Sequence, residues 1–149
     1  MMMTSLAVAL HALAALLWVG GMAFAYMFLR PSLPPLAAAE RLGLWRRLFG
    51  RFLPAVGGAI LVLLVTGYWL FLGAGISGGH VHLMQALGWL MFLLYGHLVG
   101  APWKRFRNAV DDGDVQAAAA HLESIRRTIA INLVLGVVVV AVGASGRYW

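Results

Sequence analysis

Residues 52–103 read FLPAVGGAILVLLVTGYWLFLGAGISGGHVHLMQALGWLMFLLYGHLVGAPW and contain no Asp, Glu, Lys or Arg. A glycine-rich connection at residues 74–81 divides this stretch into two apolar runs. At a rise of about 1.5 Å per residue, each run is long enough to cross a hydrocarbon core of about 30 Å. Lipid leaves backbone polar groups no outside partner, so such runs form helices. The stretch predicts membrane-spanning helices at about residues 52–73 and 82–103.

Two more apolar runs predict further spans at about residues 4–29 and 128–145. The first run has no basic leader and continues past signal-peptide length, so we interpret it as a retained helix. The whole chain is 62% hydrophobic and 11% charged, which excludes an ordinary soluble domain. The expected fold class is an all-α integral membrane protein: one domain, residues 1–149, forming an antiparallel bundle of four transmembrane helices.

The basic residues are gathered in the first and third connections between these spans. They are Arg30, Arg41, Arg46, Arg47 and Arg51 in the first, and Lys104, Arg105, Arg107, Arg126 and Arg127 in the third. The other side of the predicted bundle has only Arg147. Because cytoplasmic loops carry the excess of Lys and Arg, both termini are expected on the periplasmic side. The membrane also accounts for the net charge of +6, so no nucleic-acid partner is expected.

Each basic connection is expected to contain a short amphipathic helix. Residues 37–51 place Leu42, Trp45 and Leu48 on one face, which predicts a helix lying along the membrane surface. Residues 111–127 begin with aspartates and end with arginines, as the helix dipole favours.

Candidate metal ligands lie towards the predicted outer face. The chain has no cysteine, so any metal must use histidine, methionine or oxygen ligands. His11 is expected roughly 10 Å inside the membrane, and His82 opens the third span from the same side, so the two side chains are expected to meet. A histidine in a transmembrane helix can serve only to hydrogen-bond across the bundle, but an imidazole in lipid is unfavourable, which favours a functional role for His11 over that alternative. For His82, a wetted interfacial side chain is an equal alternative.

His80, His82 and Met84 occupy alternate positions before and within the third span. Two imidazole nitrogens and a thioether suit copper, especially Cu(I). The spacing aligns them only if the segment is extended there, and His80 is otherwise a solvated loop residue. The metal ligands predicted at this face are therefore His11, His82, Met84 and His80.

Three further residues are candidates for binding a cofactor. Trp18 shares a helix face with His11, and Gln85 shares one with His82. His97 lies fifteen positions beyond His82, about 22 Å further along the axis, so one small metal ion cannot bind both. His97 is expected either to pair with Asn132 or to belong to a second site.

The chain resembles the single-domain members of the copper resistance protein D (CopD) family over nearly its whole length. The resemblance is carried by residues 10–33 (LHALAALLWVGGMAFAYMFLRPSL), 51–71, 80–97 and 125–149, and within them by His11, Trp18, Gly20, Gly21, Thr66-Gly67-Tyr68 and His82. It implies a protein of the bacterial inner membrane that functions in copper uptake or tolerance. A periplasmic copper carrier or a respiratory complex is the partner implied.

The chain is similar, more distantly, to the HemJ-type protoporphyrinogen oxidases, small four-helix proteins that bind b-type haem. His11 and His82 match histidines of that family, whereas Met84 stands near the place of a lysine in those enzymes. This departure argues against the oxidase activity. It leaves haem b as the alternative cofactor to copper, with His11 and either His82 or His97 as axial ligands of an electron-transfer protein.

A third alternative is an accessory subunit of a larger membrane complex, in which the histidines only pack. No carboxylate lies in the predicted spans, so hydrolytic catalysis is not expected. Any enzyme activity would be that of a haem-dependent oxidoreductase. Homo-oligomer formation is compatible with every one of these alternatives.

Overall fold

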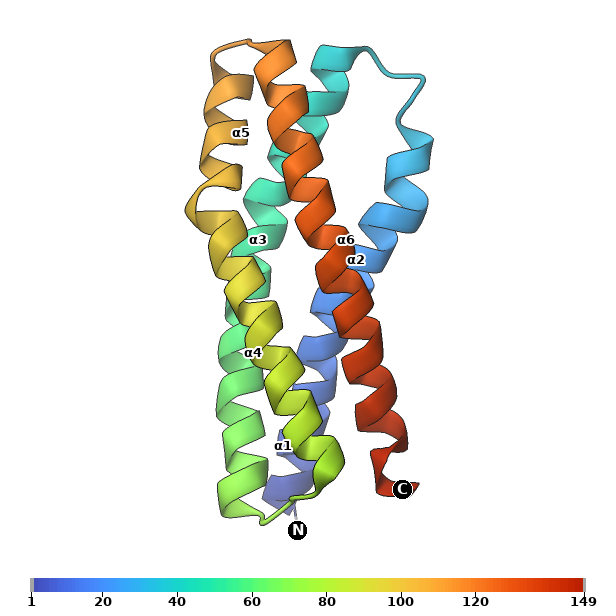
Figure 1. Cartoon of the computed structure of the whole chain (residues 1–149), viewed down its shortest axis with the longest axis vertical. Coiled ribbons are helices and arrows are strands. Elements are labelled where there is room, and N and C mark those ends of the chain that lie inside the picture. Colours follow the sequence, from blue (N-terminus) through green and yellow to red (C-terminus); the bar gives the residue numbers. More distant parts are fainter. Residues whose placement is uncertain (1, 149) are drawn as a thin grey trace.

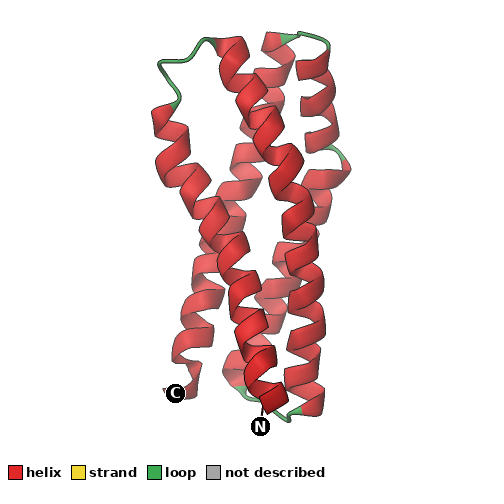
Figure 2. Ribbon diagram, turned by 180° about the vertical axis from the view of Figure 1, so that it is seen from behind, coloured by secondary structure: helices red, strands yellow, loops and turns green. Residues whose placement is uncertain are grey.

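The computed structural model describes residues 2–148, and these are almost entirely helical (Figures 1 and 2). Four helical rods lie side by side, and the N- and C-terminal ends lie at the same end of the molecule. Four helices are long and apolar enough to cross a membrane, and they cover Met2–Ser32, Ala38–Gly73, Gly79–Asp111 and Val115–Ser145. The prediction of four spanning helices, and with it a lipid environment, is confirmed by the length and composition of these helices.

The first and second rods each change helical pitch along their length. The first consists of α1 (Met2–Ala15), a π-helical segment Leu16–Gly20, α2 (Gly21–Phe24), a second π-helical segment Ala25–Leu29 and a 3₁₀ turn Arg30–Ser32. The second consists of α3 (Ala38–Tyr68) and the π-helical segment Trp69–Gly73. The third contains α4 (Gly79–Gly100) and α5 (Pro102–Asp111), and the fourth is α6 (Val115–Ser145) followed by the 3₁₀ turn Gly146–Tyr148.

The amphipathic segment predicted at residues 37–51 is not a separate surface helix. It forms the first turns of α3 and continues without interruption into the second span. Pro54 lies inside α3, where it removes the hydrogen bond to the carbonyl of Gly50. The buried stripe continues past it at helical spacing, through Trp45, Phe49, Leu53 and Val56. Continuous packing of this face therefore outweighs the one lost hydrogen bond.

The fourth rod likewise joins a predicted loop helix to a predicted span. It begins at Val115, because the Asp114 side chain accepts a hydrogen bond of 2.9 Å from the Ala117 amide and caps the helix. Gly113 just before it has a φ of +74°, a backbone conformation that glycine adopts readily. Residues 115–127 and 128–145 are thus one helix.

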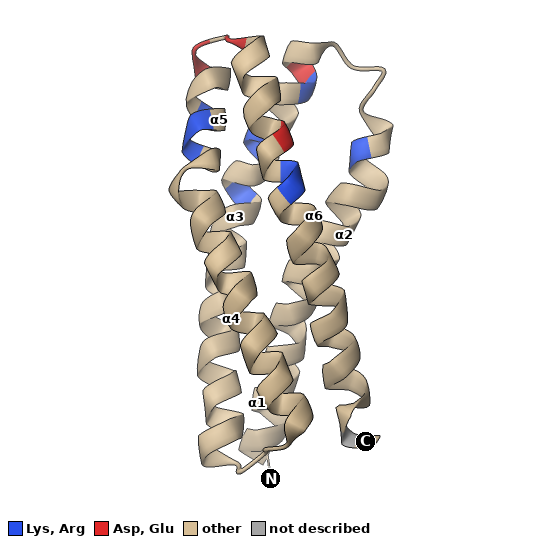
Figure 3. Ribbon diagram, in the orientation of Figure 1, with Lys and Arg blue, Asp and Glu red and all other residues tan. Residues whose placement is uncertain are grey.

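The charged residues gather at the end of the molecule opposite the termini (Figure 3). Here α3, α5 and α6 bury an aromatic core that includes Trp45, Phe49, Trp103 and Phe106. Phe49 lies at its centre, 1% exposed, with its ring centroid 5.1 Å from that of Trp45 and 6.3 Å from that of Phe106. This end is the best-packed part of the molecule.

The half that carries the termini is packed more loosely, as two helix pairs. There α1 packs against α3, and α4 packs against α6. Only Met91 and Leu98 of α4 are buried, and large apolar side chains of α1 such as Leu13 and Leu16 are exposed. Lipid tails are as apolar as these side chains, so such surfaces are stable in a bilayer. The predicted metal ligands also lie in this half: His11 in α1, and His80, His82 and Met84 in the first turns of α4.

Candidate functional site

His11 is held by the second span. Its Nδ1 lies 2.8 Å from Oγ1 of Thr66, a residue of α3 that is 7% exposed. Gly67 provides room for the ring, because a Cβ at that position would lie only 3.2 Å from His11 Cε1. The close packing of α1 on α3 therefore fixes the imidazole by one hydrogen bond and one glycine contact.

The hydrogen bonds of Thr66 determine the tautomer of His11. The Thr66 hydroxyl lies 2.6 Å from the carbonyl oxygen of Val62 and donates its proton there. Because a hydroxyl has only one proton, it must accept from His11, and we assign the imidazole proton to Nδ1 on this basis. The Nε2 of a neutral His11 then keeps its lone pair. This is how proteins orient histidine ligands, with one ring nitrogen held by a neighbour and the other available.

His82 contacts the same span as His11. Its ring meets that of Phe71 edge-on, with 5.7 Å between centroids and an interplanar angle of 77°. Phe71 follows Thr66 by five residues, which corresponds to about 7 Å along a helix. Both histidines thus contact the part of the second span that lies towards the termini, at positions five residues apart, and no hydrogen bond joins them in the described part of the chain.

His80 and Met84 face the fourth span instead. Because α4 begins at Gly79, they lie one helical turn apart on one face, and His82 points elsewhere. A Cβ at Gly143 would lie 2.9 Å from Met84 Cε, and a Cβ at Gly146 would overlap the His80 ring. His80, His82 and Met84 therefore do not form one cluster, because they lie in a helix, where residues two positions apart point to different sides.

The remaining candidates are dispersed. Trp18 is buried and stacks on Phe92 at a centroid distance of 5.8 Å. Gln85 is partly buried on α4, whereas His97 is exposed. Within residues 2–148 no hydrogen bond joins His97 to Asn132, whose Oδ1 is buried without a partner.

Together these positions define two sets of donors. Within the described residues, no three His, Asp or Glu side chains are grouped as for a metal ion. The first set is the Nε2 of His11, which suits copper or haem iron, while the exposed His82 contacts the same span five residues further along, at Phe71. The second is the nitrogen and thioether pair of His80 and Met84, which suits Cu(I).

Thr66 was not predicted as the partner of His11, and Gly143 and Gly146 were not predicted as contacts of the third span. The sequence offers one signal for Thr66, because a threonine followed by glycine, Thr66-Gly67, interrupts an otherwise apolar run. Nothing in the sequence indicates which helix that pair faces.

Comparisons with protein-family models, with curated proteins and with solved structures gave no significant match. The resemblance to the CopD family stays a prediction. Function is therefore inferred from the side chains themselves.

Proposed function

We propose that this protein binds a metal centre through His11 near the periplasmic face of the bacterial inner membrane, in copper uptake or tolerance. The observation that carries the proposal is the hydrogen bond from His11 Nδ1 to Thr66, which leaves Nε2 free for a ligand. The charged end in Figure 3 is then cytoplasmic and both termini are periplasmic, as the distribution of basic residues favours.

The choice of copper is supported by the second donor set. His80 and Met84 share the first turns of α4, at the end of the molecule that carries the termini. A borderline nitrogen and a soft sulfur favour Cu(I) over divalent zinc or magnesium. A periplasmic carrier would deliver copper to this exposed end, and His82 and His11 lie on the neighbouring span.

The second candidate function is electron transfer by a b-type haem. It is favoured by the placement of His11 and His82 against one segment of the second span, at Thr66 and Phe71. Two imidazoles from different helices are the usual axial ligands in haem-binding bundles. If neither group binds, the accessory-subunit alternative holds.

The test is to purify the protein with a cleavable tag that contains no histidine, and to measure copper content and the absorption spectrum together. Variants His11→Ala, His82→Ala and Met84→Leu address the two donor sets. His121→Ala, in the charged end of α6, is the matched control.

Copper binding that falls in His11→Ala and Met84→Leu but not in His121→Ala supports the copper proposal. A Soret band that is lost in His11→Ala supports the haem alternative instead. A wild-type protein that binds neither group, with copper tolerance unchanged in every variant, contradicts both.

A further inference from the structure

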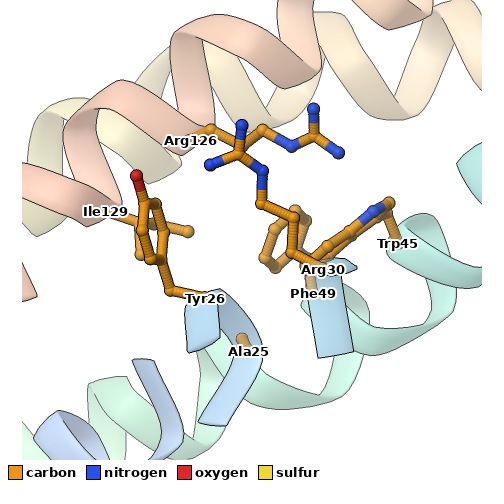
Figure 4. A pocket seen from close by; sticks show the side chains of 7 residues that line it. All are labelled: Ala25, Tyr26, Arg30, Trp45, Phe49, Arg126 and Ile129. Atoms are coloured by element: carbon orange, nitrogen blue, oxygen red, sulfur yellow. The ribbon is translucent and has the colours of Figure 1, made fainter. Parts of the chain in front are cut away.

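Three arginines from three different spans line one open pocket at the charged end of the molecule. Arg30 lies at the end of the first span, Arg41 lies in the first turns of α3, and Arg126 lies in α6. With Pro34 they surround a volume of about 250 Å³. Figure 4 shows the guanidinium groups of Arg30 and Arg126 close to each other. The fold thus concentrates positive charge from distant parts of the sequence.

Negative charge from the protein does not balance this cluster. The only carboxylate paired with these arginines among the described residues is Glu123, 3.7 Å from Arg126, and its side chain is 59% exposed. Arg46 offers a contrast, because it binds both carboxylate oxygens of Asp111 at 3.0 Å. Like charges held this close repel one another unless an anion lies between them.

Two buried hydrogen-bond donors, one in this pocket and one in the recess beside it, also have no acceptor. They are Nε of Arg126 and Nε1 of Trp45, neither of which has a partner in the described part of the chain. Trp45 is 2% exposed, and the Arg126 guanidinium lies over its ring at 5.7 Å from the centroid. Buried donors are nearly always paired in native proteins, so both indicate a ligand with acceptor oxygens.

Directly beside the arginines the lining becomes apolar. A small recess shares Arg30 and Arg126 with the basic pocket and is otherwise lined by Ala25, Tyr26, Trp45, Phe49 and Ile129 (Figure 4). Tyr26, which lines the recess, is 37% exposed, so the recess opens towards the lipid-facing surface of the first span. Aromatic residues of this kind are enriched where a membrane surface meets water. A charged group with an attached hydrocarbon chain matches this arrangement.

We propose that the pocket of Arg30, Arg41 and Arg126 binds the phosphate group of an anionic glycerophospholipid from the adjacent leaflet. A planar guanidinium group can donate two hydrogen bonds to the oxygens of one phosphate. The positive charge of the pocket favours a lipid with a net negative charge, because a zwitterionic headgroup carries its own cation. The acyl chains lie along the exposed apolar face of the first span. The apolar recess and the lipid-facing aromatics favour a lipid over free phosphate as the source of this group.

The experiment measures lipid binding to the intact, detergent-purified protein by native mass spectrometry. Phosphatidylglycerol is titrated against phosphatidylcholine, with glycerol 3-phosphate and inorganic phosphate as soluble competitors. Arg30→Gln, Arg41→Gln and Arg126→Gln each remove one charge from the pocket. Arg127→Gln removes the same charge from the next position, which is exposed and does not line the pocket. Arg126→Lys keeps the charge and removes the planar fork.

Wild-type protein is expected to prefer phosphatidylglycerol, and each pocket variant is expected to weaken its binding about fivefold to tenfold. Arg127→Gln should stay within about twofold of wild type, and Arg126→Lys should lie between the two. Equal losses in Arg126→Gln and Arg127→Gln would show diffuse surface attraction and overturn the proposal. Displacement of the lipid by equimolar inorganic phosphate would overturn the choice of a lipid. Helix content by circular dichroism confirms that each variant is folded.

Discussion

His11 Nδ1 lies 2.8 Å from Thr66 Oγ1, and that oxygen lies 2.6 Å from the carbonyl oxygen of Val62. This chain of two hydrogen bonds ties the first span to the second and gives His11 a single orientation. It also makes Thr66 a positioning residue for any metal bound at Nε2. The relationship is testable by stability and by ligand binding separately.

Replacing Thr66 with valine keeps the shape of the side chain and removes the acceptor for His11. We expect the free energy of unfolding in detergent to fall by about 1 kcal/mol, because a half-buried imidazole N–H is left unpaired. Thr66→Ser should restore it. Thr128→Val is the control, since the Thr128 hydroxyl donates to the Ser124 carbonyl on its own helix and so joins no two spans. Equal stability of Thr66→Val and Thr66→Ser would mean that the hydrogen bond contributes nothing.

The glycines of α3 should differ sharply in their tolerance of alanine. A Cβ at Gly67 would lie 3.2 Å from the His11 ring, whereas a Cβ at Gly58 meets nothing within 4 Å. Alanine in an open helical position gains about 0.5 to 1 kcal/mol over glycine, so Gly58→Ala should raise the melting temperature. Gly67→Ala should not, because the ring must move. The idea fails if thermal unfolding shows the same gain for both.

Tyr95 links the third span to the second through its hydroxyl, which donates a hydrogen bond of 2.8 Å to the Leu53 carbonyl. Gly57 admits this hydroxyl, since a Cβ there would lie 2.9 Å from it. Tyr95→Phe is expected to cost about 0.6 to 1.5 kcal/mol of stability. Tyr68→Phe, at a ring that is 41% exposed, should cost less. Equal melting temperatures for the two variants would contradict this role of Tyr95.

Asn132 is 5% exposed, and its Oδ1 has no hydrogen-bond partner within residues 2–148. Removing an unpaired buried polar atom relieves a desolvation cost of about 1 kcal/mol or more, so Asn132→Leu should stabilise the protein. Because His97 is exposed and forms no hydrogen bond with Asn132, the effects of Asn132→Leu and His97→Ala should add. A coupling energy above about 0.5 kcal/mol in the double-mutant cycle would restore the predicted pairing of these residues.

The sequence alone determined the four apolar helices and the segregation of charge, because length, hydropathy and charge are local properties of each segment. It did not show that residues 37–51 and 115–127 continue their neighbouring spans, since helix continuity depends on a buried stripe formed with other helices. Pro54 illustrates this: it stands near the predicted start of the second span at residue 52, yet it lies well inside α3, because Leu53 and Val56 stay packed on either side.

The candidate sites depended more heavily on the tertiary structure. His11 and His82 are recognisable in the sequence as unusual side chains, but only the packing of α1 on α3 identifies Thr66 as the partner of His11. Likewise, helical geometry separates His82 from His80 and Met84, although alternate spacing suggested one cluster. Arg30, Arg41 and Arg126 share a pocket only because three spans end together. A sequence records which side chains are present, whereas their proximity comes from helix faces that pack over long separations along the chain.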